Sequence, residues 1–143
     1  MSASDQERTG GCLCGGVRYR MKEEPLITAI CHCRHCQRQS GSAFSVVCAV
    51  PDSGFEQDGE TQVYIDRGDS GQAVQRHFCP NCGSPVVSIV EALPGLTIVK
   101  AGTLDDPSSI VPTQEAYCRD AWTIVPRLQG TQCFHTSNIG GAA

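Results

Sequence analysis

Ten of the 143 residues are cysteines, and most of them fall into three tight groups. The groups are GGCLCGG with Cys12 and Cys14, CHCRHC with Cys31, Cys33 and Cys36, and FCPNCGSP with Cys79 and Cys82. The backbone holds sulfurs one or two positions apart too close to pair easily with each other, whereas such sulfurs converge readily on a metal ion. The spacing therefore favours metal binding over a disulfide framework.

The start of the chain supports this interpretation. The segment MSASDQERTGG lacks the cationic start and the apolar stretch of a secretory signal. No apolar run approaches the roughly twenty residues that span a bilayer. We therefore expect a soluble, cytoplasmic protein with no membrane partner, whose thiols face a reducing pool.

The charge of the chain excludes one class of partner. The formal net charge is -4 and the sequence pI is about 5.5. Such a chain has no broad basic field to attract nucleic acid, so we expect no nucleic-acid partner.

Short segments rich in β-branched residues, separated by turn signals, predict a mainly β fold. The expected strands are VRYRM, LITAI, AFSVVCAV, TQVYI, AVQRHF, PVVSIV and LTIVKA. They follow one another too closely for helical crossovers, so antiparallel pairing is favoured. In VRYRM, alternation places Val17, Tyr19 and Met21 toward a core and the two arginines between them toward water.

Helix signals are few. We expect one turn after Cys33 and a second helix at LDDPSS, begun by Pro107 and capped by Asp105 or Asp106.

The chain has the length of one domain. We expect a single zinc-binding β domain spanning 1–143, with its core over about 11–126 and loose tails at 1–10 and 130–143. Exposed sheet edges allow a homodimer.

Two of the cysteine groups suit a closed metal site. The C-x-x-C turn of Cys79 and Cys82 is half of a tetrahedral zinc site, because its backbone N–H groups can point at the sulfurs. A structural zinc takes four ligands, and Cys12 with Cys14 supplies the missing pair. The sequence predicts an all-thiolate structural zinc that joins two distant segments.

Cys31, Cys33 and Cys36 remain, and three protein ligands are typical of a catalytic zinc with an open fourth position. Three thiolates around Zn²⁺ leave a net charge of about -1, which makes the ion a weak Lewis acid and a poor source of hydroxide. A small thiol at the open position would keep its nucleophilic character. The predicted reaction is zinc-assisted addition of a thiol to an electrophile.

Other candidate residues receive less weight. His32 and His35 lie inside the three-cysteine motif, but the thiols already suffice, so we leave both out of the metal shell and expect them to face solvent or bond to backbone. Cys48 is expected to be a buried small hydrophobe, and Cys118 and Cys133 are expected to be ordinary free thiols. The arginines and Gln37 beside the open site suit either a substrate carboxylate or a solvated turn.

Four motifs together carry a family resemblance. GCLCGGVRY, CHCRHCQRQSG, FCPNCGSP and KAGTLDDP occur in the order and at about the spacing of the glutathione-dependent formaldehyde-activating family, also called the centromere protein V family. The chain resembles that family from about Gly11 to the region of Trp122. One position departs from it, because Glu115 stands where histidine is often expected.

The resemblance implies coiled antiparallel β-sheets with zinc knuckles, like those of methionine sulfoxide reductase B and the Rab-associated exchange factor. It implies two zinc ions per chain, one structural and one catalytic, on the same cysteine sets that the spacing indicates. It further implies a carbon–sulfur lyase that condenses formaldehyde with glutathione to S-(hydroxymethyl)glutathione.

Two other functions stay open from the sequence. The main alternative is a non-catalytic zinc-binding β module for a protein or peptide partner. Methionine sulfoxide reduction is the weaker one, because here the third cysteine group has metal-like crowding rather than separate redox cysteines.

Overall fold

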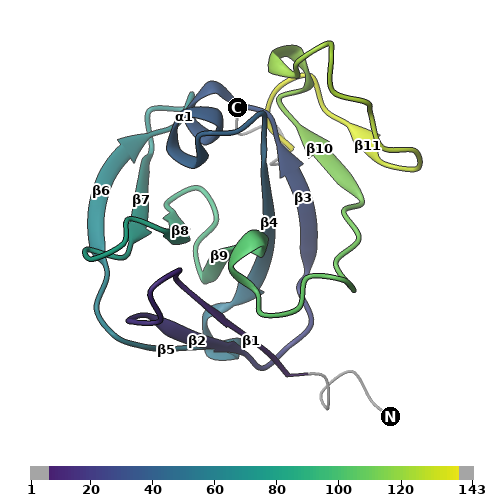
Figure 1. Cartoon of the computed structure of the whole chain (residues 1–143). Coiled ribbons are helices and arrows are strands. Elements are labelled where there is room, and N and C mark those ends of the chain that lie inside the picture. Colours follow the sequence, from purple (N-terminus) through teal and green to yellow (C-terminus); the bar gives the residue numbers. More distant parts are fainter. Residues whose placement is uncertain (1–6, 139–143) are drawn as a thin grey trace.

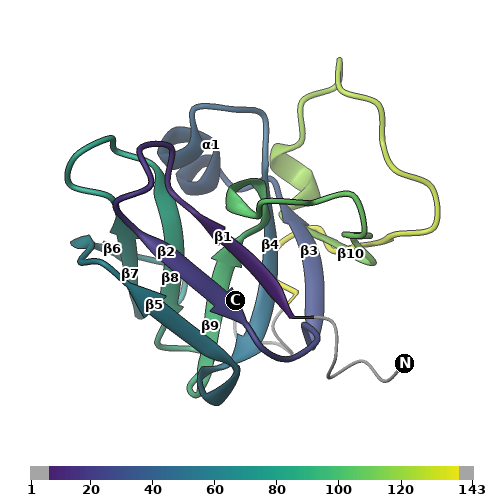
Figure 2. The same ribbon diagram turned by 60° about the horizontal axis from the view of Figure 1, so that its bottom comes forward.

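The structure, a computed structural model, describes residues 7–138. Two β-sheets carry the fold, and the smaller sheet lies across one face of the larger (Figures 1 and 2). The smaller sheet has the strand order β1-β2-β5, with β1 at Arg8–Gly11, β2 at Arg18–Met21 and β5 at Phe55–Asp58.

The larger sheet has eight strands in the order β11-β10-β3-β4-β9-β8-β7-β6. Their bounds, in chain order, are β3 Ile27–Cys31, β4 Ser45–Pro51, β6 Gln62–Arg67, β7 Ala73–Phe78, β8 Pro85–Val90, β9 Leu96–Lys100, β10 Gln114–Ala116 and β11 Gln132–Cys133.

The mainly β fold class is confirmed, and each of the seven predicted segments forms a strand. Strands β3, β4, β9, β8, β7 and β6 pair antiparallel in that order. The opposite edge of the sheet is different, because β10 joins both β3 and β11 in parallel. This edge is built from the last part of the described chain, so the sheet is mixed rather than purely antiparallel.

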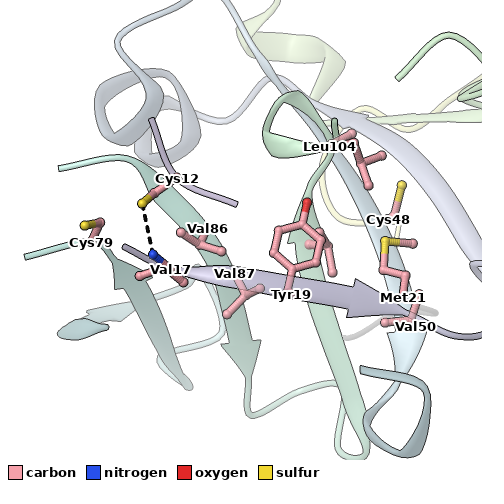
Figure 3. Packing of buried hydrophobic residues seen from close by; sticks show 12 residues of the cluster. Cys12, Val17, Tyr19, Met21, Cys48, Val50, Cys79, Val86, Val87 and Leu104 are labelled. Carbon is pink, nitrogen blue, oxygen red and sulfur yellow. Dashed lines mark hydrogen bonds between the residues drawn. The ribbon is translucent and has the colours of Figure 1, made fainter. Parts of the chain in front are cut away.

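The apolar core lies between the two sheets. Val17, Tyr19 and Met21 project from the β1-β2 hairpin into it and are 1%, 2% and 0% exposed, which confirms the predicted alternation. They meet Val86 of β8 and Val50 of β4 from the large sheet (Figure 3). Cys48 is fully buried in the same cluster, as the sequence predicts.

The opposite face of the large sheet carries two buried cationic side chains. Side chains alternate along a strand, and residues paired across strands share a face. The register Ala29↔Val47↔Lys100 therefore places Lys100 on the face that also carries Cys31. Through β8 and β9, Arg76 shares that face too.

Helix α1 (Arg34–Ser40) confirms the turn expected after Cys33, and it links β3 to β4 at one end of the large sheet (Figure 1). Cys33 is its N-cap, and the Cys33 sulfur accepts the backbone N–H of Cys36 at 3.2 Å. Gly41 ends the helix with φ of 66°, a left-handed conformation that glycine adopts without strain. Between residues 7 and 138 there are also three 3-10 turns, at Asp52–Gly54, Ala101–Thr103 and Cys118–Asp120.

The prediction of a helix at LDDPSS is wrong. Residues 105–110 form bends and a turn, in which the Asp106 carboxylate accepts the N–H of Ser108 at 3.0 Å. The neighbouring Asp105 instead accepts a hydrogen bond from Arg18 on β2 at 3.0 Å. The two acids therefore serve a turn and an ion pair between segments, not a helix start.

The prediction of loose tails is also partly wrong. Residues 8–11 form β1, and Gln132–Cys133 form β11 within the predicted tail 130–143. Residues 1–6 and 139–143 lie outside the described part of the chain. Between residues 7 and 138, no helix has both the length and the apolar character needed to cross a membrane. The homodimer stays a prediction.

Candidate metal centres

The structure brings the first and third cysteine groups together. The ligand atoms of Cys12, Cys14, Cys79 and Cys82 all lie within 4.8 Å of one another. The Cys12 and Cys14 sulfurs are 3.6 Å apart, and those of Cys14 and Cys79 are 3.7 Å apart. A tetrahedron with Zn–S bonds of about 2.3 Å has sulfur–sulfur edges of about 3.8 Å. The four sulfurs therefore already have nearly the spacing that a zinc ion requires.

Backbone and hydroxyl groups hold these sulfurs in place. The N–H of Val17 donates to the Cys12 sulfur at 3.2 Å, and the N–H of Asn81 donates to the Cys79 sulfur at 3.4 Å. Hydrogen bonds from the side chain and the backbone of Ser84 lower the pKa of Cys82 to about 5. Donors directed at sulfur favour the thiolate form, which is the form that binds metal.

The second cysteine group also converges. Cys31 ends β3, Cys33 caps α1, and Cys36 lies one turn into that helix. Their sulfurs lie within 4.8 Å of one another, and no fourth histidine, cysteine or carboxylate between residues 7 and 138 joins the group. The predicted three-ligand arrangement is therefore present as geometry.

Two buried cations lie close enough to act on this group. Lys100 is 6% exposed and its Nζ donates to Ser45 Oγ at 3.1 Å. Arg76 is 7% exposed and pairs with Asp66 at 2.8 Å. Hydrogen bonds with the Cys31 and Cys33 thiols lower the pKa of Cys36 well below its ordinary value; burial opposes this, and the charges of Lys100 and Arg76 reinforce it. Neither cation could be recognised from the sequence, because both lie far from the motif along the chain.

The two histidines of the motif lie outside both cysteine groups. His35 Nδ1 bonds to Asp66 Oδ2 at 2.8 Å on the surface. His32 does not face solvent as expected, since it is 4% exposed and its Nε2 lies 2.8 Å from Glu115 Oε1. Because alternate residues of a strand point to opposite faces, His32 points away from the side of the sheet that carries Cys31.

Gln37 is a structural brace rather than a substrate-facing residue. It is 3% exposed, and its Nε2 donates to the carbonyls of His32 at 2.7 Å and Asp120 at 3.0 Å. Its Oε1 accepts the indole N–H of Trp122 at 3.0 Å. Through these bonds the segment after β10 holds the start of α1, and with it the three-cysteine loop.

Glu115 is the centre of a hydrogen-bond network that the sequence did not predict. It is 1% exposed, and its carboxylate accepts hydrogen bonds from Thr131 and bonds to His32. Burial alone would raise the pKa of Glu115, but hydrogen bonds from Thr131 and His32 and the charge of Arg127 lower it below its ordinary value. His32, Glu115 and Cys118 could together hold a metal ion by distance alone, but both carboxylate oxygens already have protein partners.

A cavity of about 320 Å³ lies beside this network. His32, Glu115, Phe44 and Val125 contribute to its mainly apolar wall, and none of the seven cysteines of the metal groups lines it. The cavity and the three-cysteine group therefore lie on opposite faces of β3.

A β protein with one four-cysteine group and one three-cysteine group is the class that this geometry defines. The family model described as "Glutathione-dependent formaldehyde-activating enzyme" matches residues 7–120. The chain belongs to this family, which confirms the resemblance seen in its motifs.

Structural comparison supports the fold alone. A crystal structure of a Rhodobacter sphaeroides protein matches with a TM-score of 0.52 and 18% identity. The match covers 68% of this chain and 87% of that one. No curated protein matches the sequence.

Proposed function

We propose that the protein adds a small thiol, with glutathione as the first candidate, to formaldehyde or another small aldehyde. In this reaction a carbon–sulfur bond forms between the thiol sulfur and the carbonyl carbon, and the thiol proton ends on the former carbonyl oxygen. The product with glutathione and formaldehyde is S-(hydroxymethyl)glutathione, and the reverse reaction is that of a carbon–sulfur lyase. The family description supports both substrates.

One observation carries the proposal: three sulfurs converge at Cys31, Cys33 and Cys36 without a fourth protein ligand among residues 7–138. When bound there, a zinc ion would offer a fourth position that favours the thiolate of a small thiol and keeps the sulfur nucleophilic. Cys12, Cys14, Cys79 and Cys82 would hold a second, structural zinc, because four ligands leave no position for a substrate.

The charges around the three-cysteine group fit this chemistry. Three cysteine thiolates carry more negative charge than a dication neutralises, and a thiolate substrate adds one more. Lys100 and Arg76 supply positive charge from the same face of the sheet, in a buried setting where solvent screens little. We assign these two residues the role of stabilising the anionic sulfurs, with Ser45 and Asp66 as the partners that fix their positions.

The reaction itself provides the test. Glutathione and formaldehyde also form their adduct without a catalyst, so exchange between free and adduct forms is followed by NMR with the zinc-loaded protein and compared with the blank without it. We expect faster exchange with the protein and no acceleration with the C33S variant. Exchange at the blank rate, with two zinc ions bound, would favour a non-catalytic zinc module that binds a protein partner. Turnover of a methionine sulfoxide with dithiothreitol would instead favour a reductase.

A further inference from the structure

Two cysteines outside the metal groups, Cys118 and Cys133, lie beside each other at the edge of the large sheet. Strands β10 and β11 pair in parallel with Glu115 opposite Cys133. The backbone N–H of Cys118 donates to the carbonyl of Phe134 at 2.9 Å, which brings the two cysteine-bearing segments side by side. The sequence, in contrast, indicated two unrelated free thiols.

Both sulfurs gather around one residue. Cys118 Sγ donates to the Glu115 carbonyl at 3.5 Å, and Cys133 Sγ donates to the Glu115 carboxylate at 3.6 Å. Burial, followed by a hydrogen bond with the Cys133 thiol, raises the pKa of Cys118 to about 11. The two thiols thus lie against the same residue at the sheet edge.

The two cysteines differ in what can reach them. Cys133 is exposed, whereas Cys118 is half-buried. Arg127 Nη2 donates to the Cys133 sulfur at 2.6 Å. The Cys133 sulfur is thus accessible and lies against a positive charge, which is the kind of setting that reactive cysteines occupy. Cys133 is therefore the thiol that an oxidant in solution meets first, with Cys118 placed behind it as the second thiol.

The same surroundings argue against a third metal at this place. Arg127 Nε lies 3.6 Å from the Glu115 carboxylate, in addition to the contact of its Nη2 with Cys133. A metal cation bound between these groups would be repelled by the guanidinium and would have to displace the hydrogen bonds of Glu115.

We propose that Cys118 and Cys133 form an oxidisable dithiol, a modification site separate from both metal groups, which a hydroperoxide converts to a disulfide. In the first step the Cys133 sulfur attacks the outer peroxide oxygen, the O–O bond breaks, and an alcohol or water leaves with the proton. In the second step the Cys118 sulfur attacks the Cys133 sulfenic acid, the S–S bond forms, and the hydroxyl leaves as water with the Cys118 proton. The dithiol loses two electrons and the peroxide gains them.

The disulfide would close the segment that braces α1. Residues 118–133 include Trp122 and Asp120, both of which hydrogen-bond to Gln37 beside Cys36. The family model ends at residue 120, so Arg127 and Cys133 lie beyond the matched region. The site therefore combines one residue of the matched domain with two that follow it.

Peptide mapping of the zinc-loaded full chain tests the proposal. Trypsin cleaves after Lys100, Arg119 and Arg127, so Cys118 and Cys133 fall alone into peptides 101–119 and 128–143. After brief treatment with a small excess of hydrogen peroxide, alkylation of the remaining thiols and digestion, we expect these two peptides to be linked. Their joint mass should be two hydrogens below the sum of the separate peptides. A chromogenic chelator added in parallel should detect no released zinc at that stage.

Three variants separate the roles. C118S should abolish the link and leave a Cys133 sulfenic acid that dimedone traps, whereas C133S should abolish both signals. R127Q should slow the formation of the link, because it removes the cation that contacts the Cys133 sulfur. C48A removes a buried thiol elsewhere and should leave the link unchanged.

Two results would overturn the proposal. One is oxidation of the metal-group cysteines, with zinc release, while Cys118 and Cys133 are still fully alkylated. The other is a third zinc ion per chain that C118S removes. The first result is measured on the wild-type chain alone, and the third zinc ion of the second is counted there before C118S is made. Neither result bears on the proposed thiol addition.

Discussion

The sulfur atoms of Cys14 and Cys79 lie 3.7 Å apart although 65 positions separate the two residues along the chain. Cys14 belongs to the turn between β1 and β2, and Cys79 to the turn between β7 and β8. The two hairpins belong to different sheets. A zinc ion held by these four sulfurs would therefore fasten the small sheet to the large one, at the end of the core where Val17 meets Val86 (Figure 3).

If a zinc ion joins the two sheets here, C79S should unfold the protein or leave it only marginally stable. The binding free energy of a structural zinc is part of the folding free energy, so we expect the free energy of unfolding to fall by several kcal/mol. Urea unfolding followed by circular dichroism, with a zinc count on the same sample, measures both quantities. C48A, which removes a core thiol outside the metal groups, should keep both zinc ions. A C79S protein with wild-type stability would contradict the structural role.

The three-cysteine group predicts that C33S responds differently from C79S. Cys33 caps α1, and a serine oxygen can accept the N–H of Cys36 in the same way, since serine is among the best N-cap residues. The variant should therefore fold with nearly unchanged melting temperature while one zinc ion per chain is lost. C36S, which leaves the cap intact, should show the same loss of zinc. If C33S unfolds the chain, the three-cysteine group is structural.

Local patterns in the sequence were sufficient for seven of the eleven strands found between residues 7 and 138, and for the three cysteine groups. The predicted strands are those with β-branched residues and turn signals at both ends, and ligand spacing is a local property as well. Strand β1 was missed because its sequence, RTGG, has a low β propensity. Gly10 is required there by packing, because a Cβ would come within 2.5 Å of the Tyr19 hydroxyl and the Thr103 carbonyl.

The surroundings of the sites could not be predicted, because they depend on pairings between distant segments. Glu115 bonds to His32 across 83 positions, and Lys100 bonds to Ser45 across 55. Strand β10 has only three residues, and its parallel position beside β3 is what buries Glu115. No local pattern reports such a pairing, so the sequence showed which cysteines come together but not which charges act on them.

The buried ammonium of Lys100 gives a prediction about activity. K100M should retain both zinc ions and lower kcat/KM for thiol addition by about 10- to 100-fold, as expected when a charged partner behind a metal site is lost. Adduct formation followed by NMR, with zinc measured on the same sample, checks this. K22M removes the other lysine of the chain, at the surface, and should behave like the wild type. Equal rates in K100M and wild type would leave Lys100 without a part in the reaction.

The network around Glu115 gives a prediction about stability. In E115Q an amide replaces a carboxylate that His32, Thr131 and Arg127 all approach. The amide NH₂ group cannot accept a hydrogen bond, so at least one of these donors loses its acceptor. We expect a loss of about 1–3 kcal/mol in the free energy of unfolding, the usual cost of buried unpaired polar groups. Thermal and urea unfolding measure it, with E60Q at an exposed position as the matched control. Both zinc ions should stay bound, because neither metal group includes Glu115.

Tyr19 gives a prediction about alkaline pH. Burial raises the pKa of Tyr19 from its ordinary value of 10.0 to about 12, so the folded state favours the neutral phenol. A raised pKa in the folded state stabilises the protein fully below pH 10, and this stabilisation is lost as pH rises toward 12. The loss amounts to roughly 2–3 kcal/mol, because each pKa unit corresponds to about 1.4 kcal/mol.

Y19F removes the titrating group and isolates this contribution. At neutral pH the variant should be less stable by about 1 kcal/mol, because the hydroxyl bonds to Thr103 at 2.7 Å and phenylalanine cannot. Toward about pH 12 the wild type should lose that advantage, since only the wild type has to bury a phenol that ionises when unfolded. Urea unfolding from about pH 9 to about pH 12 should therefore give curves that converge and then cross, because the loss of roughly 2–3 kcal/mol exceeds that advantage. Y64F, at an exposed tyrosine, should run parallel to the wild type, and parallel curves for Y19F as well would show that Tyr19 does not couple pH to folding.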